Sequence, residues 1–348
     1  MSRGSNQGRR RFLTGAAATI AGLELAMNGS TKSLLQAMGL AADSRLSALR
    51  NATAWLNSPP LTAEGLRRKV VAIDFWTYTC INWLRTLPYV RAWSEKYRDA
   101  GLVVIGVHTP EFDFEHDLDN VRRAITAMRV DYPIAVDNGY AIWNGFSNQY
   151  WPALYLIDAK GATRFTHFGE GAYDDSERKI QKVLGDLGAK GFNPALVTVD
   201  TRGLEVAADW DNLRSPENYL GSVRTEGFRA NRDASRLGVN QWALDGDWKQ
   251  SPRAVALNKP NGRIVYRFHA RDLNLVMGPA VRGASVRFRV RIDGQPAGGG
   301  ADVDAQGNGV VTEQRTYQLI RQTQPIVDRQ FEIEFLDPGV EAFCFTFG

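Results

Sequence analysis

The chain has 348 residues, of which 44% are hydrophobic and 23% are charged, as in an ordinary globular protein. This length allows two domains, each large enough to bury a core of its own. The formal net charge is +4, but residues 1–30 carry four Arg and one Glu, so the rest of the chain is left with about +1. A net charge this close to zero gives no support for nucleic-acid binding.

The first residues have the pattern of an export signal. The run Arg9-Arg10-Arg11-Phe12-Leu13 fits the twin-arginine pattern. The apolar run at 12–27 is interrupted by Glu24 and is too short to span a bilayer, and no later stretch is apolar enough to do so. We therefore predict a twin-arginine signal and processed region at 1–45, export to the periplasm and no stable membrane span. The alternative is a basic tail without a targeting role.

A helical segment, a break and a buried strand are predicted next. Residues 31–57 have helical patterning, and Ser58-Pro59-Pro60 marks the break after them. Val70–Ile73 is a short apolar run typical of a central parallel strand, which Asp74-Phe75-Trp76 closes. Residues 77–79 are predicted to form a turn.

Cys80 follows that turn, at the start of a predicted helix that runs to about Arg98 and contains Pro88. Unpaired N–H groups and the positive end of the helix dipole stabilise a thiolate at such a position. Cys80 is therefore a candidate nucleophile. The alternative is a buried, inert thiol.

Strands and helices alternate in the following part of the chain. The predicted elements are a buried strand at 101–108, a helix at 117–128, an extended piece at 130–136, a short helix at 138–146, a strand at 150–158, an edge strand at 162–168 and a helix at 175–187. This alternation predicts a mostly parallel sheet with helices on its faces. The turn at 159–161 makes the last two strands a hairpin, which adds an antiparallel edge.

From about residue 240 the pattern is all-β, after a predicted linker at 191–220. Residues 285–292 alternate strictly and place Arg on the wet face of a strand. Further strands are predicted at 264–269, 273–277, 331–335 and 343–347. Short alternating strands separated by turns predict a β-sandwich.

The segment around Cys80 closely resembles the redox loop of thioredoxin-fold proteins, with Asp-Phe-Trp ending the strand, Cys80 six residues after Asp74 and Pro88 eight residues after Cys80. The string from Thr77 to Pro88 resembles the exported TlpA-like domain at the C-terminal end of DipZ-type proteins and their free-standing bacterial relatives. Residues 215–221 and 340–348 resemble parts of the carbohydrate-binding-module-like jelly roll that follows this domain in the family.

The resemblance implies an α/β thioredoxin fold at 46–190, a linker at 191–220 and an all-β, jelly-roll-like sandwich at 221–348. The family has a second cysteine three residues after the first, and here that position holds Trp83. A dithiol enzyme attacks a disulfide with one thiolate and resolves the mixed disulfide with the other. Trp83 has no thiol with which to resolve a mixed disulfide. Cys80 would therefore have to act with an external thiol, or after its own oxidation to sulfenic acid.

The resemblance also implies roles for other residues near Cys80. Asp74 matches a buried acid, whose pKa burial would raise, and which could relay a proton; the alternative is a carboxylate near solvent. Pro152 is expected to follow a cis peptide bond, the alternative being an ordinary trans proline. The predicted substrate-binding residues are Trp76, Trp83, Trp151, Pro152, His108 and Glu111.

Metal and cofactor sites are not predicted. No Cys and His residues have ligand spacing, and the remaining histidines, His116, His167 and His269, are scattered and interpreted as structural. Cys344, in the terminal strand, is not expected to form a disulfide with Cys80.

Three functions remain open. The first is a periplasmic thioredoxin-like protein that exchanges disulfides with protein or small-molecule thiols through Cys80. The second is a peroxiredoxin-like thiol peroxidase, suggested by Thr77-x-x-Cys80, although Ile73 stands where that pattern has proline. The third is a redox-inactive binding module, with a glycan stacked on Trp242, Trp248 and Tyr266, for which core packing is the favoured interpretation. We adopt the first.

Overall fold

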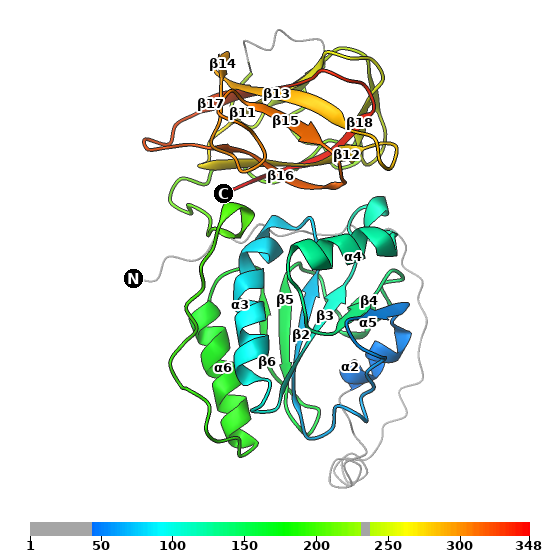
Figure 1. Ribbon diagram of the computed structural model, residues 1–348, viewed down its shortest axis with the longest axis vertical. Helices are drawn as coiled ribbons and strands as arrows, with labels where there is room; N and C mark the ends of the chain where they lie inside the picture. The colour runs from blue at the N-terminus through cyan, green and yellow to red at the C-terminus, as the bar shows by residue number, and fades with distance from the viewer. Residues whose placement is uncertain (1–43, 231–236) are drawn as a thin grey trace, which may run out of the picture. The chain divides into compact units, whose positions relative to one another are not determined.

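The computed structural model describes residues 44–230 and 237–348, which form two compact units (Figure 1). The first unit contains Tyr78 and the described residues before it, together with Thr86–Val199. The second unit contains Thr79–Arg85 and Asp200–Gly348. The twin-arginine motif lies outside the described residues. Within them, no helix combines the length and apolar character needed to cross a membrane.

A six-stranded mixed sheet forms the centre of the first unit. Its strands are β1 (Ala54–Leu56), β2 (Val70–Trp76), β3 (Leu102–His108), β4 (Ile134–Val136), β5 (Ala153–Ile157) and β6 (Thr163–Phe168), in the order β1-β4-β3-β2-β5-β6. Strands β2, β3 and β4 are parallel, whereas β1, β5 and β6 run antiparallel to their neighbours. The antiparallel hairpin edge is confirmed, but the sheet is less parallel than predicted.

The extra antiparallel strand is β1, where the sequence pattern predicted a helix. The described part of 31–57 starts as helix, with α2 (Ser44–Ser47) and the 3₁₀ helix η1 (Ala48–Asn51). The chain then pairs with β4, with Trp55 opposite Ala135. The backbone N–H of Thr53 also donates to Val136 (2.8 Å). The prediction failed here because the open edge of β4 has N–H and C=O groups that need partners.

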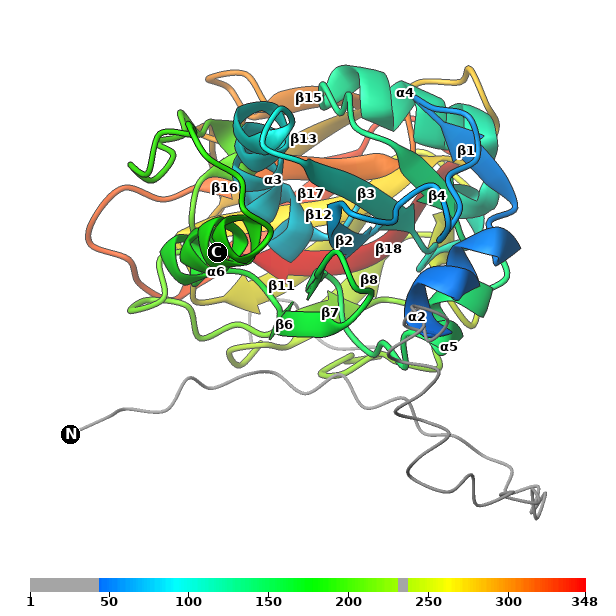
Figure 2. The same cartoon turned by 90° about the horizontal axis from the view of Figure 1, so that it is seen from below.

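Helices cover both faces of this sheet. They are α3 (Ile81–Tyr97), the 3₁₀ helix η2 (Asp113–His116), α4 (Leu118–Ala127), α5 (Ala141–Gly145) and α6 (Tyr173–Asp186). Asp117 caps α4 by accepting a hydrogen bond from the backbone of Asp119 (2.8 Å). On the face that carries Phe75, the rings of Trp143 and Phe146 from the α5 region pack against it. Figure 2 shows α2 and α5 side by side.

Helices α3 and α6 are joined by a buried carboxylate on α6. Glu177 accepts hydrogen bonds from Trp93 (3.3 Å), Lys96 (2.8 Å) and Tyr97 (2.6 Å) of α3, and from the backbone of Val197 (2.9 Å). Burial acts to raise the pKa of Glu177, but the hydrogen bonds, first that from Lys96, outweigh it and hold this pKa below its ordinary value. The carboxylate therefore fixes the helix pair that lies over β2.

Two six-stranded antiparallel sheets make up the rest of the second unit. One has the order β16-β12-β18-β10-β9, with β7 on β18, and the other β14-β13-β17-β11-β8, with β15 on β13. The strands are β7 (Asn218–Tyr219), β8 (Trp242–Asp245), β9 (Trp248–Gln250), β10 (Val255–Leu257), β11 (Gly262–Phe268), β12 (Asp272–Pro279), β13 (Val286–Ile292), β14 (Gln295–Pro296), β15 (Asn308–Val311), β16 (Arg315–Arg321), β17 (Arg329–Phe335) and β18 (Val340–Phe347). The short 3₁₀ helix η3 (Gly203–Glu205) precedes them, and β7 lies within the predicted linker.

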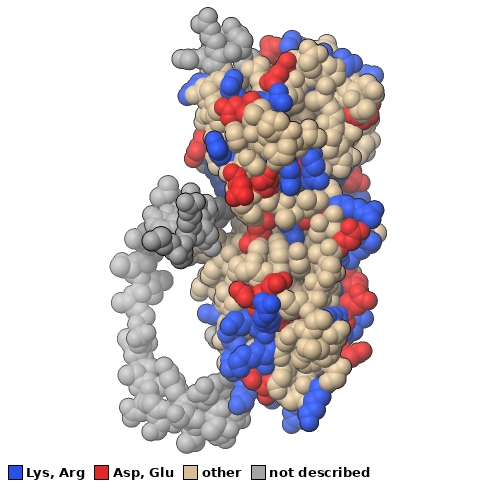
Figure 3. All heavy atoms as spheres, turned by 90° about the vertical axis from the view of Figure 1, so that its left-hand side faces the viewer, with Lys and Arg blue, Asp and Glu red and all other residues tan. Residues whose placement is uncertain are grey.

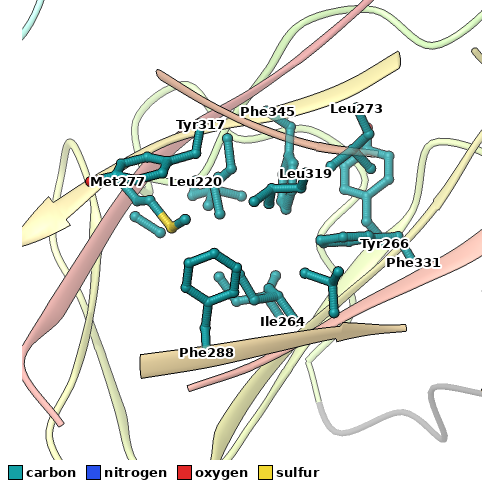
Figure 4. Close-up of a cluster of buried hydrophobic side chains, with 14 of the residues drawn as sticks. Leu220, Ile264, Tyr266, Leu273, Met277, Phe288, Tyr317, Leu319, Phe331 and Phe345 are labelled. Atoms are coloured by element: carbon teal, nitrogen blue, oxygen red, sulfur yellow. The ribbon is translucent and has the colours of Figure 1, made fainter. Parts of the chain in front are cut away.

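Apolar side chains from both sheets fill the space between them (Figure 4). On β13, Phe288 and Val290 are buried, while Arg289 lies on the outer face, as its alternation predicted. Trp242 and Tyr266 are fully buried in this core, which confirms the favoured core-packing interpretation for both. Trp248 is partly buried against it.

Basic and acidic side chains are interspersed on the face of the molecule drawn in Figure 3. On the outer face of the β-sandwich, for example, Arg287 pairs with Asp337 (2.8 Å) and Arg291 with Glu332 (3.6 Å). Mixed charge of this kind agrees with the low net charge of the chain.

Candidate redox site

The fold places Cys80 at the start of α3, as predicted. Strand β2 ends at Trp76, and residues 77–79 connect it to the helix. The carbonyl oxygen of Cys80 accepts a hydrogen bond from the backbone of Leu84 (2.9 Å), which makes Cys80 the N-cap residue. Its thiol is therefore next to the positive end of the helix dipole, which favours a thiolate.

Cys80 is 3% exposed, and Trp83, which replaces the second cysteine of the motif, is 0% exposed. Neither Cys80 nor Cys344 is in a disulfide. Thiol–disulfide exchange needs direct attack by one sulfur on another. A reaction at Cys80 therefore requires this region to open locally.

The segment Thr79–Arg85 belongs to the second compact unit. Within that unit, the hydroxyl of Thr316 donates to the carbonyl oxygen of Thr79 (2.8 Å). The guanidinium of Arg85 donates to the carbonyl oxygen of Phe347 (3.0 Å). These bonds hold the backbone on both sides of Cys80.

Asp74 and Pro152 lie together at a small cavity in the first unit. The cavity has a volume of about 10 Å³ and is lined by Asp74, Thr86, Val90, Trp93, Pro152, Leu154, His167, Gly169, Gly171, Tyr173 and Ser176. Asp74 is 1% exposed, so the prediction of a buried acid is confirmed. The Trp151–Pro152 peptide bond is cis, as predicted.

His108 is a neutral, fully buried side chain beside Trp76. The two residues are opposite each other in β3 and β2, and their rings are 4.8 Å apart. The ring of Tyr78 stacks on His108 at 5.8 Å. Neither imidazole nitrogen meets a donor or acceptor of another described residue. Burial, with a smaller effect from His116, lowers the pKa of His108 to about 3, so it carries no charge at neutral pH.

Trp151 and Glu111 contribute to the loops at the same end of the sheet. The indole N–H of Trp151 donates to the carbonyl oxygen of Thr109 (3.1 Å), and its ring lies 4.3 Å from that of Trp143. Glu111 is half-buried, and its backbone N–H donates to the carboxylate of Glu115 (2.6 Å). Both residues therefore have structural contacts here, and their roles in substrate binding stay predictions.

Most of the cavity lining was not predicted as part of the site, including Thr86, His167 and Tyr173. The hydroxyl groups of Thr86 and Tyr173 lie 3.4 Å apart, which joins α3 to α6 at the cavity wall. His167 was interpreted as structural because the histidines are scattered along the sequence. In the part of the chain that the structure describes, His, Cys, Asp and Glu side chains form no group of three suited to a metal ion.

The arrangement of mixed sheet, capping cysteine and cis-proline is that of thioredoxin-like proteins, so the first unit has a thioredoxin fold and the second is an all-β sandwich. Residues 215–348 match the family model described as "Thioredoxin like C-terminal domain". The chain is 34% identical over 329 residues to the protein DipZ of Mycobacterium tuberculosis and to that of Mycobacterium bovis, which covers 90% of this chain and 44% of theirs. It therefore spans less than half the length of these curated relatives.

Smaller relatives match the first unit. The thiol-disulfide oxidoreductase YkuV of Bacillus subtilis is 29% identical over 133 residues, which covers 38% of this chain and 89% of YkuV. Among solved structures, the solution structure of a thioredoxin-like protein in its oxidised form is 30% identical, with a TM-score of 0.36, and covers 38% of this chain and 90% of that one.

Proposed function

We propose that this chain is an exported thiol–disulfide protein that acts through one cysteine, Cys80. The observation that supports this most is the position of Cys80 as N-cap of α3, directly after the central strand β2. The relative YkuV is named a thiol-disulfide oxidoreductase, which agrees with this class of chemistry. The twin-arginine motif at Arg9-Arg10 supports export to the periplasm.

The proposed reaction has two steps. The Cys80 thiolate attacks one sulfur of a disulfide in a protein or a small molecule. A bond forms between the two sulfurs, the substrate S–S bond breaks, and the other substrate sulfur leaves as a thiolate. An external low-molecular-weight thiol then attacks the substrate sulfur of the mixed disulfide as a thiolate. A disulfide forms between the external thiol and that sulfur, the bond to Cys80 breaks, and Cys80 leaves as a thiolate. The external thiol is needed because Trp83 cannot supply the second sulfur.

A second candidate is a binding module without redox activity. Trp83 in the position of the second cysteine, and the burial of both Trp83 and Cys80, favour it. A glycan-binding version has less support, because Trp242 and Tyr266 are in the core, which leaves the partly buried Trp248 as the accessible member of that set. A peroxidase would differ from both by consuming hydrogen peroxide with a thiol donor.

The proposed function is tested by replacing Trp83→Cys in the full chain. We expect the wild type to form a mixed disulfide with oxidised glutathione, detected as one adduct by mass spectrometry. With reduced glutathione as the thiol donor, it should reduce insulin disulfides slowly. Trp83→Cys should reduce them at least about tenfold faster, because an internal thiolate resolves the mixed disulfide at high effective concentration.

Two serine variants serve as controls. Cys80→Ser should lose the adduct, whereas Cys344→Ser should keep it. Absence of an adduct in the wild type, together with turnover in Trp83→Cys, would support the binding module instead. Adduct formation that survives Cys80→Ser would show that the reactive site has been wrongly placed.

A further inference from the structure

Five rings form a continuous cluster beside the turn that precedes Cys80. We call it the aromatic cluster, and its members, in order of contact, are Trp76, His108, Tyr78, Phe114 and Phe112. Each of these residues is at most 9% exposed. Trp76 ends β2, His108 ends β3, and the two phenylalanines come from the loop and the 3₁₀ helix that follow β3. Tyr78 is the member that lies in the turn itself.

Tyr78 is held in this cluster by its ring. The ring lies nearly parallel to that of His108, with 15° between the planes and 5.8 Å between the centroids, and its centroid is 6.1 Å from that of Phe114. The hydroxyl lies near Asn120 of α4 but makes no hydrogen bond of ordinary length and angle with a described residue. The packing of the ring therefore outweighs the hydroxyl as an anchor.

The two ends of the turn are fixed through the backbone. Trp76 accepts a hydrogen bond from the N–H of Thr109 (3.0 Å), and Cys80 accepts one from the N–H of Leu84 (2.9 Å). Strand β2 and helix α3 therefore hold the chain on either side. The residues between them are held by the bond from Thr316 to the carbonyl oxygen of Thr79 (2.8 Å) and by the ring of Tyr78.

The rings beyond Tyr78 belong to a loop with firm attachments of its own. The carboxylate of Glu115 accepts a hydrogen bond from the backbone of Phe112 (2.9 Å). The side chain of Asn120 donates to the carbonyl oxygen of Phe114 (2.8 Å). The rest of the cluster is therefore a fixed surface, and the ring of Tyr78 is the part that a movement of the turn would withdraw from it.

We propose that Tyr78 is a positioning residue for Cys80, and that withdrawal of its ring from His108 and Phe114 is the local opening that exposes the thiol. All residues from Thr77 to Cys80 are at most 3% exposed, so the thiol reaches solvent when this turn moves. A reagent then meets the sulfur only as often as the ring leaves the cluster. The opening is independent of the proposed function, whereas its control of disulfide exchange at Cys80 rests on that function.

The test is the rate at which iodoacetamide alkylates Cys80 in the folded full chain, measured for each cysteine-containing peptide by mass spectrometry. The other cysteine of the chain, Cys344, is 1% exposed on β18 and is the internal reference. We expect Tyr78→Leu to speed alkylation of Cys80 about tenfold, because leucine loses the ring contacts, and to leave the rate at Cys344 unchanged. An unchanged rate at Cys80, or an equal rise at both cysteines, would overturn the proposal.

Two control variants separate the ring from other causes. Tyr78→Phe keeps the ring and removes the hydroxyl, so the rate at Cys80 should stay within about twofold of the wild type. Phe146→Leu removes a buried ring that lies 5.2 Å from that of Phe75, on the other face of the same sheet, and should also leave Cys80 within about twofold. If either control were as fast as Tyr78→Leu, the hydroxyl or general weakening of the unit would be the cause, and the proposal would be wrong.

Phe114→Leu decides the question if Tyr78→Leu does not fold. This variant removes one of the rings that Tyr78 contacts and leaves Tyr78 itself in place. The rate at Cys80 should rise about threefold, because part of the packing of the Tyr78 ring is lost. A rate equal to that of the wild type would contradict the proposal.

The adduct with oxidised glutathione gives a separate readout of the proposed function. It should form about tenfold faster in Tyr78→Leu than in the wild type, in step with alkylation. Faster alkylation without an adduct in either protein would uphold the opening at Tyr78 and reject the proposed function. An adduct at Cys80 together with unchanged alkylation would do the reverse.

Discussion

The interiors of the two units differ in what they bury. The core of the β-sandwich consists of aliphatic and aromatic side chains such as Phe288, Ile333 and Phe345. The interior of the thioredoxin unit instead contains Asp74, the imidazole of His108 and the hydroxyl of Tyr132, which has no hydrogen-bond partner among the described residues. The second unit also buries polar side chains, but its buried carboxylate, Asp272, is paired with Arg271 (2.6 Å) and Arg321 (2.7 Å).

Burying polar groups without full hydrogen bonding costs stability. Functional sites commonly keep such groups at a cost in stability. This comparison supports the proposal that the chemistry of the chain belongs to the end of β2 rather than to the β-sandwich core. The three predictions that follow test this contrast by altering one interior at a time.

The largest effect is expected from Phe288→Ala in the β-sandwich. Phe288 is fully buried on β13, and its ring lies 6.3 Å from that of Phe335. Its removal should lower the free energy of unfolding of this unit by about 3–5 kcal/mol, because transfer energy is lost and a cavity remains. Urea denaturation followed by far-UV circular dichroism measures it. Val310→Ala, at a site 46% exposed, should change stability by less than about 0.5 kcal/mol.

A smaller, pH-dependent effect is expected from His108→Phe in the thioredoxin unit. The pKa of His108 is lowered in the folded protein from 6.5 to about 3. Below pH 6.5 the unfolded chain binds a proton that the folded protein does not, so the wild type loses stability as the pH falls towards 3. At pH 5 this loss is about 2 kcal/mol, and His108→Phe should not show it.

Urea denaturation at pH 7.5, 6 and 5 measures this difference. The free energy of unfolding of His108→Phe, relative to that of the wild type, should rise as the pH falls. For His116→Gln, at an exposed site, it should not. If the free energies of unfolding of His108→Phe and the wild type changed with pH in parallel, His108 would be protonated in the folded protein at pH 5. The thioredoxin unit would then not bury a neutral imidazole, and the contrast between the two interiors would be weaker.

The smallest effect is expected from Glu177→Gln, which alters a buried polar group that is fully hydrogen-bonded. The loss at pH 7 should be about 1.5 kcal/mol, because the ion pair with Lys96 is lost and the Tyr97 hydroxyl then donates to a neutral acceptor. The folded pKa of Glu177 is below its ordinary 4.5, so its stabilisation is present above pH 4.5 and is lost as the pH falls through the folded value. Thermal unfolding at pH 7 and pH 3 checks this: the difference between variant and wild type should shrink at pH 3.

Much of the architecture was predictable from the sequence because its patterns are local. The apolar run of β2, the capping position of Cys80 and the alternation of β13 each follow from a few neighbouring residues. Strand β1 was missed because it is three residues long and forms only by pairing with β4, which lies about 80 residues later in the sequence. Short strands of this kind are specified by their partner rather than by their own pattern.

The position of His167 could not be predicted, because it depends on an irregularity in the β5–β6 hairpin. The register shifts between Leu156 and Ile157. A regular hairpin continued from Ile157 and Thr163 would place His167 opposite Ala153, and therefore on the other face of the sheet. The bulge places it opposite Leu154, on the face of Asp74. One extra residue in a strand thus decides whether the imidazole reaches the cavity.

The pairing of β1 with β4 also matters for aggregation. Strands at the edge of a sheet can pair with other chains, and natural proteins cover or charge them. Here Ala54–Leu56 covers β4, whose three residues are all buried, while β6 at the other edge carries the charged side chain of Arg164. A fragment that starts after Leu56 would expose an apolar edge, and we expect it to associate with itself during refolding. Fragments for structural or functional work on the thioredoxin unit should therefore retain residue 53 and those after it.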